Sequence, residues 1–486
     1  MMLKRLTLFA LAVVSCVGPA ATHAQGVRVS GVTYVQTVEL RPLVYDSVSS
    51  YFATGTGEWR LMADGTPVRC LSGNDYCSYL RSGDKISAAP LVQDLSLASW
   101  GIGEGLSVRV DVRARAQLST QGLIYPRSDR KFELIDAYAE LERSWGRGRL
   151  GRQWISGGLG VYDFDGADLL LRRDRFSLEG WAGRALEAGL NDTYASAELA
   201  GIENLPPDQD GYLFGARGRF RPNAVTAVTA MYQRVLMADH GGVYSERAAV
   251  DATTRAYGTS IDVGLAYDFA TGAWNEARLR VGRAGLHALG GSVEVRHTVP
   301  FFETWTLWGA FSPVGYDEAR ATVDWRVKAM PLVISAHGAY RKYGDTDAGL
   351  TLRSNGWRAG ADAMWQGTGA LSGFASYDVD IGNGASSNDA RASLRWSGDG
   401  DRTIGITGSA VQNIYEFRIG TGRVIGGAVD VAMPIASDLR VRADCGFYRQ
   451  LFSVGAPGPD WTQRRASVRL EWTLGRDPGL AAGKTK

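Results

Sequence analysis

The sequence predicts an all-β fold: a transmembrane, antiparallel, up-and-down β-barrel of roughly 20–24 strands, with about 22 as the best single value. Three observations predict it: long segments of strictly alternating polarity, short turns rich in Gly, Asn and Asp between them, and an N-terminal segment with the features of an export signal. An open sheet of so many strands would leave two unpaired edges, and only closure into a barrel removes them.

The clearest strand runs from Leu106 to Leu118, where every second residue is apolar and the residues between are Ser, Arg, Asp or Gln. It is longer than the ~5–6 residues usual in a soluble sheet, and it suits a tilted strand that needs ~9–11 residues to cross a bilayer. The same alternation returns at residues 276–281, 292–296, 323–328, 391–396, 439–445 and 467–474. We therefore expect these strands to present their apolar face to lipid.

Short turn signals such as Gly101–Gly105 and Ser397–Asp401 separate the strands, and Gly, Asn and Asp supply the positive φ of tight hairpins. No long helical periodicity interrupts the pattern, so residues 25–475 are predicted to form a single barrel. Aromatic residues on or near strand ends, as in the girdles of membrane barrels, are Trp305, Trp308, Trp325, Trp396 and Trp472. A secreted, soluble β-protein is the alternative that these residues leave open.

Composition excludes several other classes of protein. The chain has 61 Gly among 486 residues, and 53 Lys and Arg against 51 Asp and Glu, a formal net charge of +2. A chain this close to neutral has no global field to attract nucleic acid, so no nucleic-acid partner is expected. No apolar run after the N-terminus approaches the ~20 residues of a membrane-spanning helix, which excludes a polytopic helical membrane protein.

Residues 1–24 have the features of a Sec signal peptide: a basic start at Lys4 and Arg5, an apolar stretch, and small residues before a cleavage site after Ala24. Export combined with a barrel predicts localisation in the bacterial outer membrane. The residues around Cys16 loosely imitate a lipoprotein cleavage box, so a lipid anchor on this cysteine is a competing interpretation.

Export also permits a disulfide. Cys70 and Cys77 flank a polar, turn-rich hexapeptide, and we expect a bridge between them to staple residues 41–89, a loop or small subdomain that breaks the alternation. Cys445 shares a strand face with Leu439 and Val441, so it is expected to face lipid as a free thiol. The chain has no CxxC or CxxCH motif, so neither a metal nor any other cofactor is expected.

Two further segments depart from the strand pattern. Residues 198–211 form a second long irregular stretch, and either it or residues 41–89 is a candidate to fold into the lumen, with an external loop as the default. Residues 476–486 form a polar tail, whereas outer-membrane barrels commonly finish on an aromatic residue. We expect Trp472 to serve as a displaced signal for the assembly machinery.

No motif of enzyme chemistry is present. The chain has no G-x-S-x-G nucleophile elbow, no HExxH and no P-loop. The histidines of the mature chain are scattered singly, at His240, His287, His297 and His337. We therefore expect no enzyme, although a membrane-embedded Ser/His site that lacks a local signature is the alternative.

The polar faces of the clearest strands are rich in arginine. The predicted pore-lining residues are Arg109, Arg113, Arg115, Arg278, Arg280, Arg326, Arg391, Arg395, Arg440, Arg442 and Arg469, with Arg296 and Lys328 on the same faces. The acids on these faces are Asp111, Glu276, Glu294, Asp324, Asp444 and Glu471. A basic lumen would attract solutes that carry carboxylate or phosphate. The alternative is that arginines and acids form ladders that only brace the wall.

Residues 137–141, 149–153 and 163–167 resemble a hairpin of bacterial porins of the alginate-export and related substrate-selective type, in which a strand ending in GRQ precedes a short loop and a strand with DG. The similarity covers about thirty residues of 486. The resemblance implies a monomeric barrel that passes a small or polymeric solute, sugar-like or anionic.

The expected function is therefore an outer-membrane porin for passive passage of solutes through an arginine-rich lumen. The expected partners are outer-membrane lipid and lipopolysaccharide, the barrel assembly machinery and small solutes. The alternative is a non-conducting barrel, a scaffold or conduit that houses a periplasmic or lumen-filling protein, with residues 41–89 as a docking element.

Overall fold

The computed structural model describes residues 26–41, 43–63, 67–71, 73–119, 131–186, 210–237, 242–283, 288–299, 314–344, 353–367, 369–382, 385–416, 422–452 and 461–475. The expected signal peptide, the polar tail, residues 198–209, Trp305, Trp308, His240 and His287 lie outside these ranges. Among the described residues, no helix is long and apolar enough to cross a membrane.

The barrel is built from long antiparallel strands. They are β1 (Gly26–Leu40), β7 (Ile86–Ala88), β8 (Pro90–Gly103), β9 (Leu106–Gln117), β10 (Phe132–Arg143), β11 (Gly146–Gly157), β12 (Gly160–Arg173), β13 (Phe176–Ala185), β14 (Gly211–Asn223), β15 (Thr226–Met237), β16 (Val243–Ala256), β17 (Thr259–Asp268), β18 (Ala273–Arg283), β19 (Leu289–Thr298), β20 (Tyr316–Val327), β21 (Leu332–Tyr343), β22 (Asn355–Gln366), β23 (Leu371–Ile381), β24 (Ala385–Gly398), β25 (Arg402–Glu416), β26 (Gly422–Ala436), β27 (Leu439–Phe452) and β28 (Trp461–Gly475).

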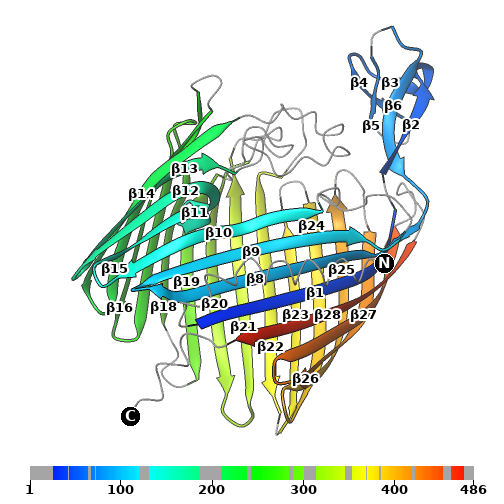
Figure 1. The fold of residues 1–486 in the computed structure, drawn as a ribbon. Helices are drawn as coiled ribbons and strands as arrows, with labels where there is room; N and C mark the ends of the chain where they lie inside the picture. Colours follow the sequence, from blue (N-terminus) through cyan, green and yellow to red (C-terminus); the bar gives the residue numbers. More distant parts are fainter. Residues whose placement is uncertain are drawn as a thin grey trace.

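The sheet closes on itself (Figure 1). Strands β8 to β28 follow in chain order, and β1 pairs antiparallel with both β28 and β8, so that Val32 faces Glu471 on one side and Asp94 on the other. The short β7 pairs with the end of β1 and continues the line of β8. Counting β7 and β8 as one strand gives a closed barrel of 22 strands, which confirms the predicted fold class and strand number.

The two ends of the barrel differ. At one end the strands are joined by short turns, as between β9 and β8 or β16 and β17, and Arg28 faces Gly475 there, so both described chain ends meet at this short-turn end. Tyr257 and Gly258 have φ of 51° and 76°, the positive values that a two-residue type I′ turn requires. The opposite, long-loop end carries the longer connections, which in outer-membrane barrels face the exterior.

The outer face of the barrel is an exposed apolar band. On β28 its residues from Leu474 to Ala466 point outward at every second position, facing residues such as Val441 and Cys445 on β27. Nine strand residues tilted by ~40° cover ~20 Å of height, close to the ~25 Å apolar band of outer-membrane barrels. Cys445 is exposed on this band and forms no disulfide, which confirms the prediction of a free thiol.

Between β1 and β7 the chain forms a separate five-stranded sheet that projects beyond the long-loop end (Figure 1). Its elements are β2 (Leu43–Ser49), the short 3₁₀ helix η1 (Ser50–Phe52), β3 (Ala53–Thr54), β4 (Trp59–Met62), β5 (Pro67–Arg69) and β6 (Tyr76–Ser82). The predicted disulfide between Cys70 and Cys77 is present and lies with fully buried Val68 in a small core. A hydrogen bond from the Arg81 guanidinium lowers the pKa of the Asp46 carboxyl on the surface of this sheet.

Candidate functional site

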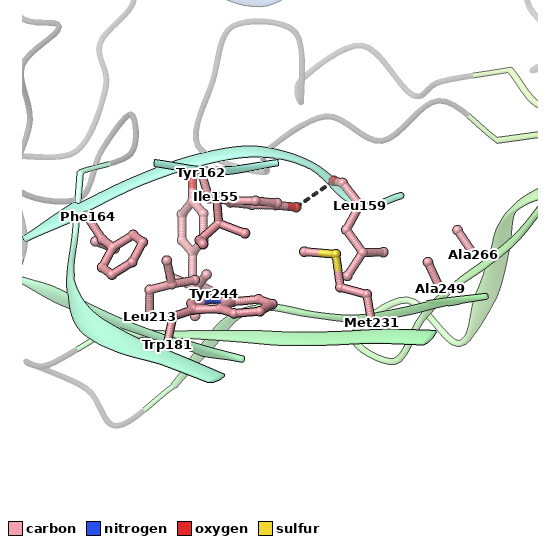
Figure 2. Packing of buried hydrophobic residues seen from close by; sticks show 12 residues of the cluster. Ile155, Leu159, Tyr162, Phe164, Trp181, Leu213, Met231, Tyr244, Ala249 and Ala266 are labelled. Atoms are coloured by element: carbon pink, nitrogen blue, oxygen red, sulfur yellow. Dashed lines mark hydrogen bonds between the residues drawn. The ribbon is translucent and has the colours of Figure 1, made fainter. Parts of the chain in front are cut away.

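The tip of the β11–β12 hairpin bends away from the barrel wall. It packs against the inner surface of the neighbouring strands, β13 to β17. Its apolar side chains Ile155, Leu159, Tyr162 and Phe164 are buried, and Figure 2 shows them facing side chains from the neighbouring wall. The wall residues of this cluster are Trp181, Ala185, Leu213, Met231, Val235, Tyr244, Ala249 and Ala266, on strands β13 to β17. The hairpin is thus held by an apolar core of its own.

Hydrogen bonds fix the hairpin tip in place. The buried guanidinium of Arg247 on β16 donates to the backbone carbonyl of Leu159 at 3.1 Å and to the Tyr162 hydroxyl at 3.0 Å. The Tyr162 hydroxyl itself donates to the Leu159 carbonyl at 2.8 Å, the bond drawn in Figure 2. Arg217 on β14 donates to the carbonyl of Ser156. Gly158 lies against the Asp251 carboxylate, so a Cβ at this position would require the Asp251 side chain to shift.

This packing identifies the inner face of the barrel. Strand β16 lies four strands along the wall from β12, and a hairpin tip reaches it only across the concave side. The residues that meet the tip, such as Arg217, Arg247 and Asp251, therefore point into the lumen. Residues that pair directly on adjacent strands point to the same side of the sheet. Asp251 pairs with Gly264, which pairs with Arg278, so Arg278 also faces the lumen. The hairpin accordingly crosses and narrows the interior.

An arginine that bridges two buried acids supports the base of the hairpin. The Arg147 guanidinium donates to the carboxylates of Asp168 at 3.0 Å and Glu179 at 2.8 Å, whose side chains are 0% and 3% exposed. Glu179 also accepts from Arg217. These contacts join β11, β12, β13 and β14 within the wall, below the tip of the hairpin.

A cavity of about 440 Å³ opens beside these residues toward the short-turn end. Its charged lining consists of Arg147, Arg172, Arg175, Arg217, Arg219 and Arg221 with Asp174 and Glu179. In the part of the chain that the structure describes, Arg175, Arg219 and Arg221 form no salt bridge. The cavity therefore carries an excess of positive charge.

Sequence reasoning missed both the hairpin tip and this cavity. The alternation of Arg217, Arg219 and Arg221 with Gly218 and Phe220 is a signal of the kind that identified other strands, and it was sufficient to find the basic side of the cavity. The inward hairpin has no such signal. Of the two segments proposed to enter the lumen, residues 41–89 form the projecting sheet β2–β6 and the short wall strand β7, and most of residues 198–211 lie outside the described ranges.

Strand register places the eleven arginines predicted to line the pore on the same face as the acids of the lumen wall. Seven of them form ion pairs with these acids: Arg109–Asp111 at 2.7 Å, Arg113–Asp94 at 2.7 Å, Arg115–Glu133 at 2.5 Å, Arg278–Glu276 at 3.3 Å, Arg395–Asp430 at 3.7 Å, Arg442–Glu471 at 3.3 Å and Arg469–Glu471 at 2.8 Å. Arg280, Arg326, Arg391 and Arg440 form no salt bridge with a described acid. Lys328 lies in a turn after β20 rather than on a strand face. Many wall arginines are thus neutralised locally, as the bracing interpretation expects.

The described histidines lie apart from one another. His297 on β19 contacts the Asp317 carboxylate at 2.8 Å, and His337 on β21 contacts Asp378 at 3.0 Å. Within the described ranges, no three His, Cys, Asp or Glu residues gather into a group that could hold a metal ion.

The closed antiparallel wall of 22 strands, with a hairpin packed inside it, places the chain among the up-and-down β-barrels. No protein-family model and no curated protein matches the chain. Among solved structures, the chain is similar to OccAB2 of Acinetobacter baumannii, with 11% identity, a TM-score of 0.41 and coverage of 94% of this chain and 99% of that one. It is also similar to OpdK of Pseudomonas aeruginosa with vanillate (9%, 0.41, 92% and 99%) and to a BenF-like porin from Pseudomonas fluorescens Pf-5 (9%, 0.42, 92% and 99%). At this level of similarity, the function has to be inferred from the geometry of this barrel.

Proposed function

We propose that the chain is an outer-membrane porin, a channel for passive passage of small or polymeric, sugar-like or anionic solutes. The observation that carries the proposal is the hairpin fixed across the inside of a closed barrel, beside a cavity whose Arg175, Arg219 and Arg221 form no salt bridge with a described acid. A barrel of this strand number is wide enough for an aqueous channel, and an inward segment narrows such a channel to the size of a solute.

The preference for anions follows from the charges that the wall leaves unbalanced. An arginine paired with a carboxylate contributes little net field, so we assign selectivity to the arginines that form no salt bridge with a described acid. These are Arg175, Arg219 and Arg221 in the cavity and Arg280, Arg326, Arg391 and Arg440 along the wall. The low-dielectric membrane around the lumen focuses their field, and guanidinium groups bind carboxylate and phosphate in bidentate geometry.

Charge reversal in the cavity tests this proposal. The refolded protein is recorded in planar bilayers under a salt gradient, and we expect a reversal potential that indicates anion preference. The double variant Arg219→Glu and Arg221→Glu should shift it toward cations, because both side chains face the lumen. Arg173→Glu is the matched control, since Arg173 follows Arg172 on β12 but pairs with Phe176 on the outer face.

Three outcomes separate the parts of the proposal. A conducting double variant with unchanged selectivity would refute the role of the cavity arginines. An equal shift in the control would show that the effect is not local to the lumen. Silence of the folded, unmodified barrel would reject the channel and favour a non-conducting scaffold.

A further inference from the structure

Four basic residues gather on the outer face of the barrel at its long-loop end: Arg423 on β26, Arg449 on β27, Arg464 on β28 and Lys85 just before β7. We call these residues the rim cluster. Arg464 pairs with Phe447, an outward residue that is 49% exposed, so Arg464 points away from the lumen. The three arginines are exposed on the side opposite the solute path.

Register brings the three arginines close together. Arg449 pairs with Thr462 on β28 and with Ile425 on β26, and these partners are two positions from Arg464 and Arg423 respectively. Diagonal neighbours of this kind lie ~7–8 Å apart, within reach of long side chains. The guanidinium groups therefore form a row that crosses three adjacent strands.

An acid, Glu39, lies against the rim cluster. Glu39 on β1 accepts from Lys85 at 2.7 Å and from the backbone N–H of Arg464 at 2.8 Å. Neither Arg423 nor the side chain of Arg464 forms a salt bridge with an acid of the described chain. Arg423 and Arg464 thus leave uncompensated positive charge on the outer face of the barrel.

The position of the rim cluster along the strands indicates which part of the membrane it contacts. Directly below Arg464 on β28, the outward residues Ala466 and Val468 begin the apolar band that ends at Leu474. The cluster is the first charged row above the band, at the level where headgroups of the outer leaflet lie. A ligand there has its apolar part beside the band and its polar part beside the arginines.

We propose that the rim cluster binds the phosphates of a phosphorylated, acylated glycolipid of the outer leaflet, the lipid A part of lipopolysaccharide. Arginine binds phosphate through two parallel hydrogen bonds, and a row over three strands suits a headgroup with more than one phosphate. The acyl chains would lie on the apolar surface below, beside Phe447 and Ile425. The proposal rests on the membrane placement of the barrel and not on its channel activity.

Native mass spectrometry of the full-length, detergent-purified protein tests this site. The protein is titrated with bisphosphorylated lipid A, with dephosphorylated lipid A and with inorganic phosphate. We expect the bisphosphorylated lipid to bind about tenfold more tightly than the dephosphorylated one, because each lost phosphate removes charge-assisted hydrogen bonds. Millimolar phosphate should displace little of the lipid, which distinguishes a lipid site from a site for the free anion.

The triple variant Arg423→Ala, Arg449→Ala and Arg464→Ala should lose this preference and retain unmodified conductance. The control is Arg173→Ala with Arg283→Ala, which removes outward arginines at the short-turn end and should leave lipid binding unchanged. Equal binding of both lipids by the unmodified protein would overturn the proposal without any variant, and so would full competition by phosphate or a triple variant that binds as before. A change of conductance alone would bear on the channel and not on this site.

Discussion

The Arg247 guanidinium on β16 donates a hydrogen bond of 3.1 Å to the backbone carbonyl of Leu159, 88 residues earlier in the chain, at the tip of the β11–β12 hairpin. Leu159 is buried in the cluster that the hairpin forms with the wall. This bond links the tip of the hairpin to a strand that lies four places along the barrel wall from β12. It holds the hairpin tip at a defined position inside the lumen.

Removing this link should loosen the hairpin. Arg247→Ala deletes the donors to Leu159 and Tyr162, and hydrogen bonds from a charged group contribute ~1.5–3 kcal/mol each. We expect larger and noisier single-channel currents and faster proteolysis at the tip. Arg247→Lys retains one charged donor, so its current size and noise should lie between those of the unmodified protein and those of Arg247→Ala. Currents of Arg247→Ala that match the unmodified protein in size and noise would show that the apolar cluster alone holds the tip.

Arg147 should be essential to the stability of the wall. Arg147→Met would leave the buried carboxylate of Asp168 without its partner and remove one of the two from Glu179. Breaking a buried pair in this way costs ~3–5 kcal/mol, so the unfolding transition in urea should move to lower concentration. Adding Asp168→Asn and Glu179→Gln to the variant should restore much of the loss. A single variant as stable as the unmodified protein would mean that water in the lumen already solvates both acids.

The Cys70–Cys77 bridge should stabilise only the projecting sheet. Closure of so small a loop contributes about 2.5 kcal/mol in the chain-entropy model. The double variant Cys70→Ser and Cys77→Ser should expose residues 43–82 to protease, while barrel assembly and conductance stay unchanged. Mobility on gels before and after heating monitors the barrel, and loss of assembly would show that the sheet is needed for barrel formation.

The accessibility of the Cys445 thiol tests whether the apolar band of the barrel lies in the bilayer. Its thiol lies on the outer band beside Val429 and Ala466, so lipid should shield it from water. A water-soluble maleimide should label it very slowly in liposomes and readily after unfolding. Rapid labelling in liposomes would place this part of β27 outside the bilayer.

Alternation of polarity predicted the barrel, its strand number and the outward thiol, because these depend only on which residues share a face. It also grouped Arg113 with the other lumen arginines. It did not reveal that Arg113 pairs with Asp94, because the partner is set by the register between β8 and β9. Many predicted pore arginines turned out to be neutralised for that reason.

The inward hairpin was beyond sequence reasoning for a different reason. Ile155 and Leu159 at its tip look like lipid-facing residues, since a strand pattern does not tell whether its end stays in the wall. The turn between β11 and β12 is also short, whereas length drew attention to residues 41–89 and 198–211. The position of the tip follows from its contacts with strands farther along the wall, such as the hydrogen bond from Arg247 to Leu159 and the contact of Gly158 with Asp251.

The most direct test of a channel narrowed by the hairpin compares the conductance of the unmodified protein with that of a variant without the hairpin tip. Gln153 and Phe164 face each other in register, so a two-residue Asn-Gly turn can join them in place of residues 154–163. We expect steady, anion-preferring single-channel currents from both proteins, with a larger conductance for the shortened one. Silence of both folded proteins, or equal conductance, would contradict a channel narrowed by this hairpin.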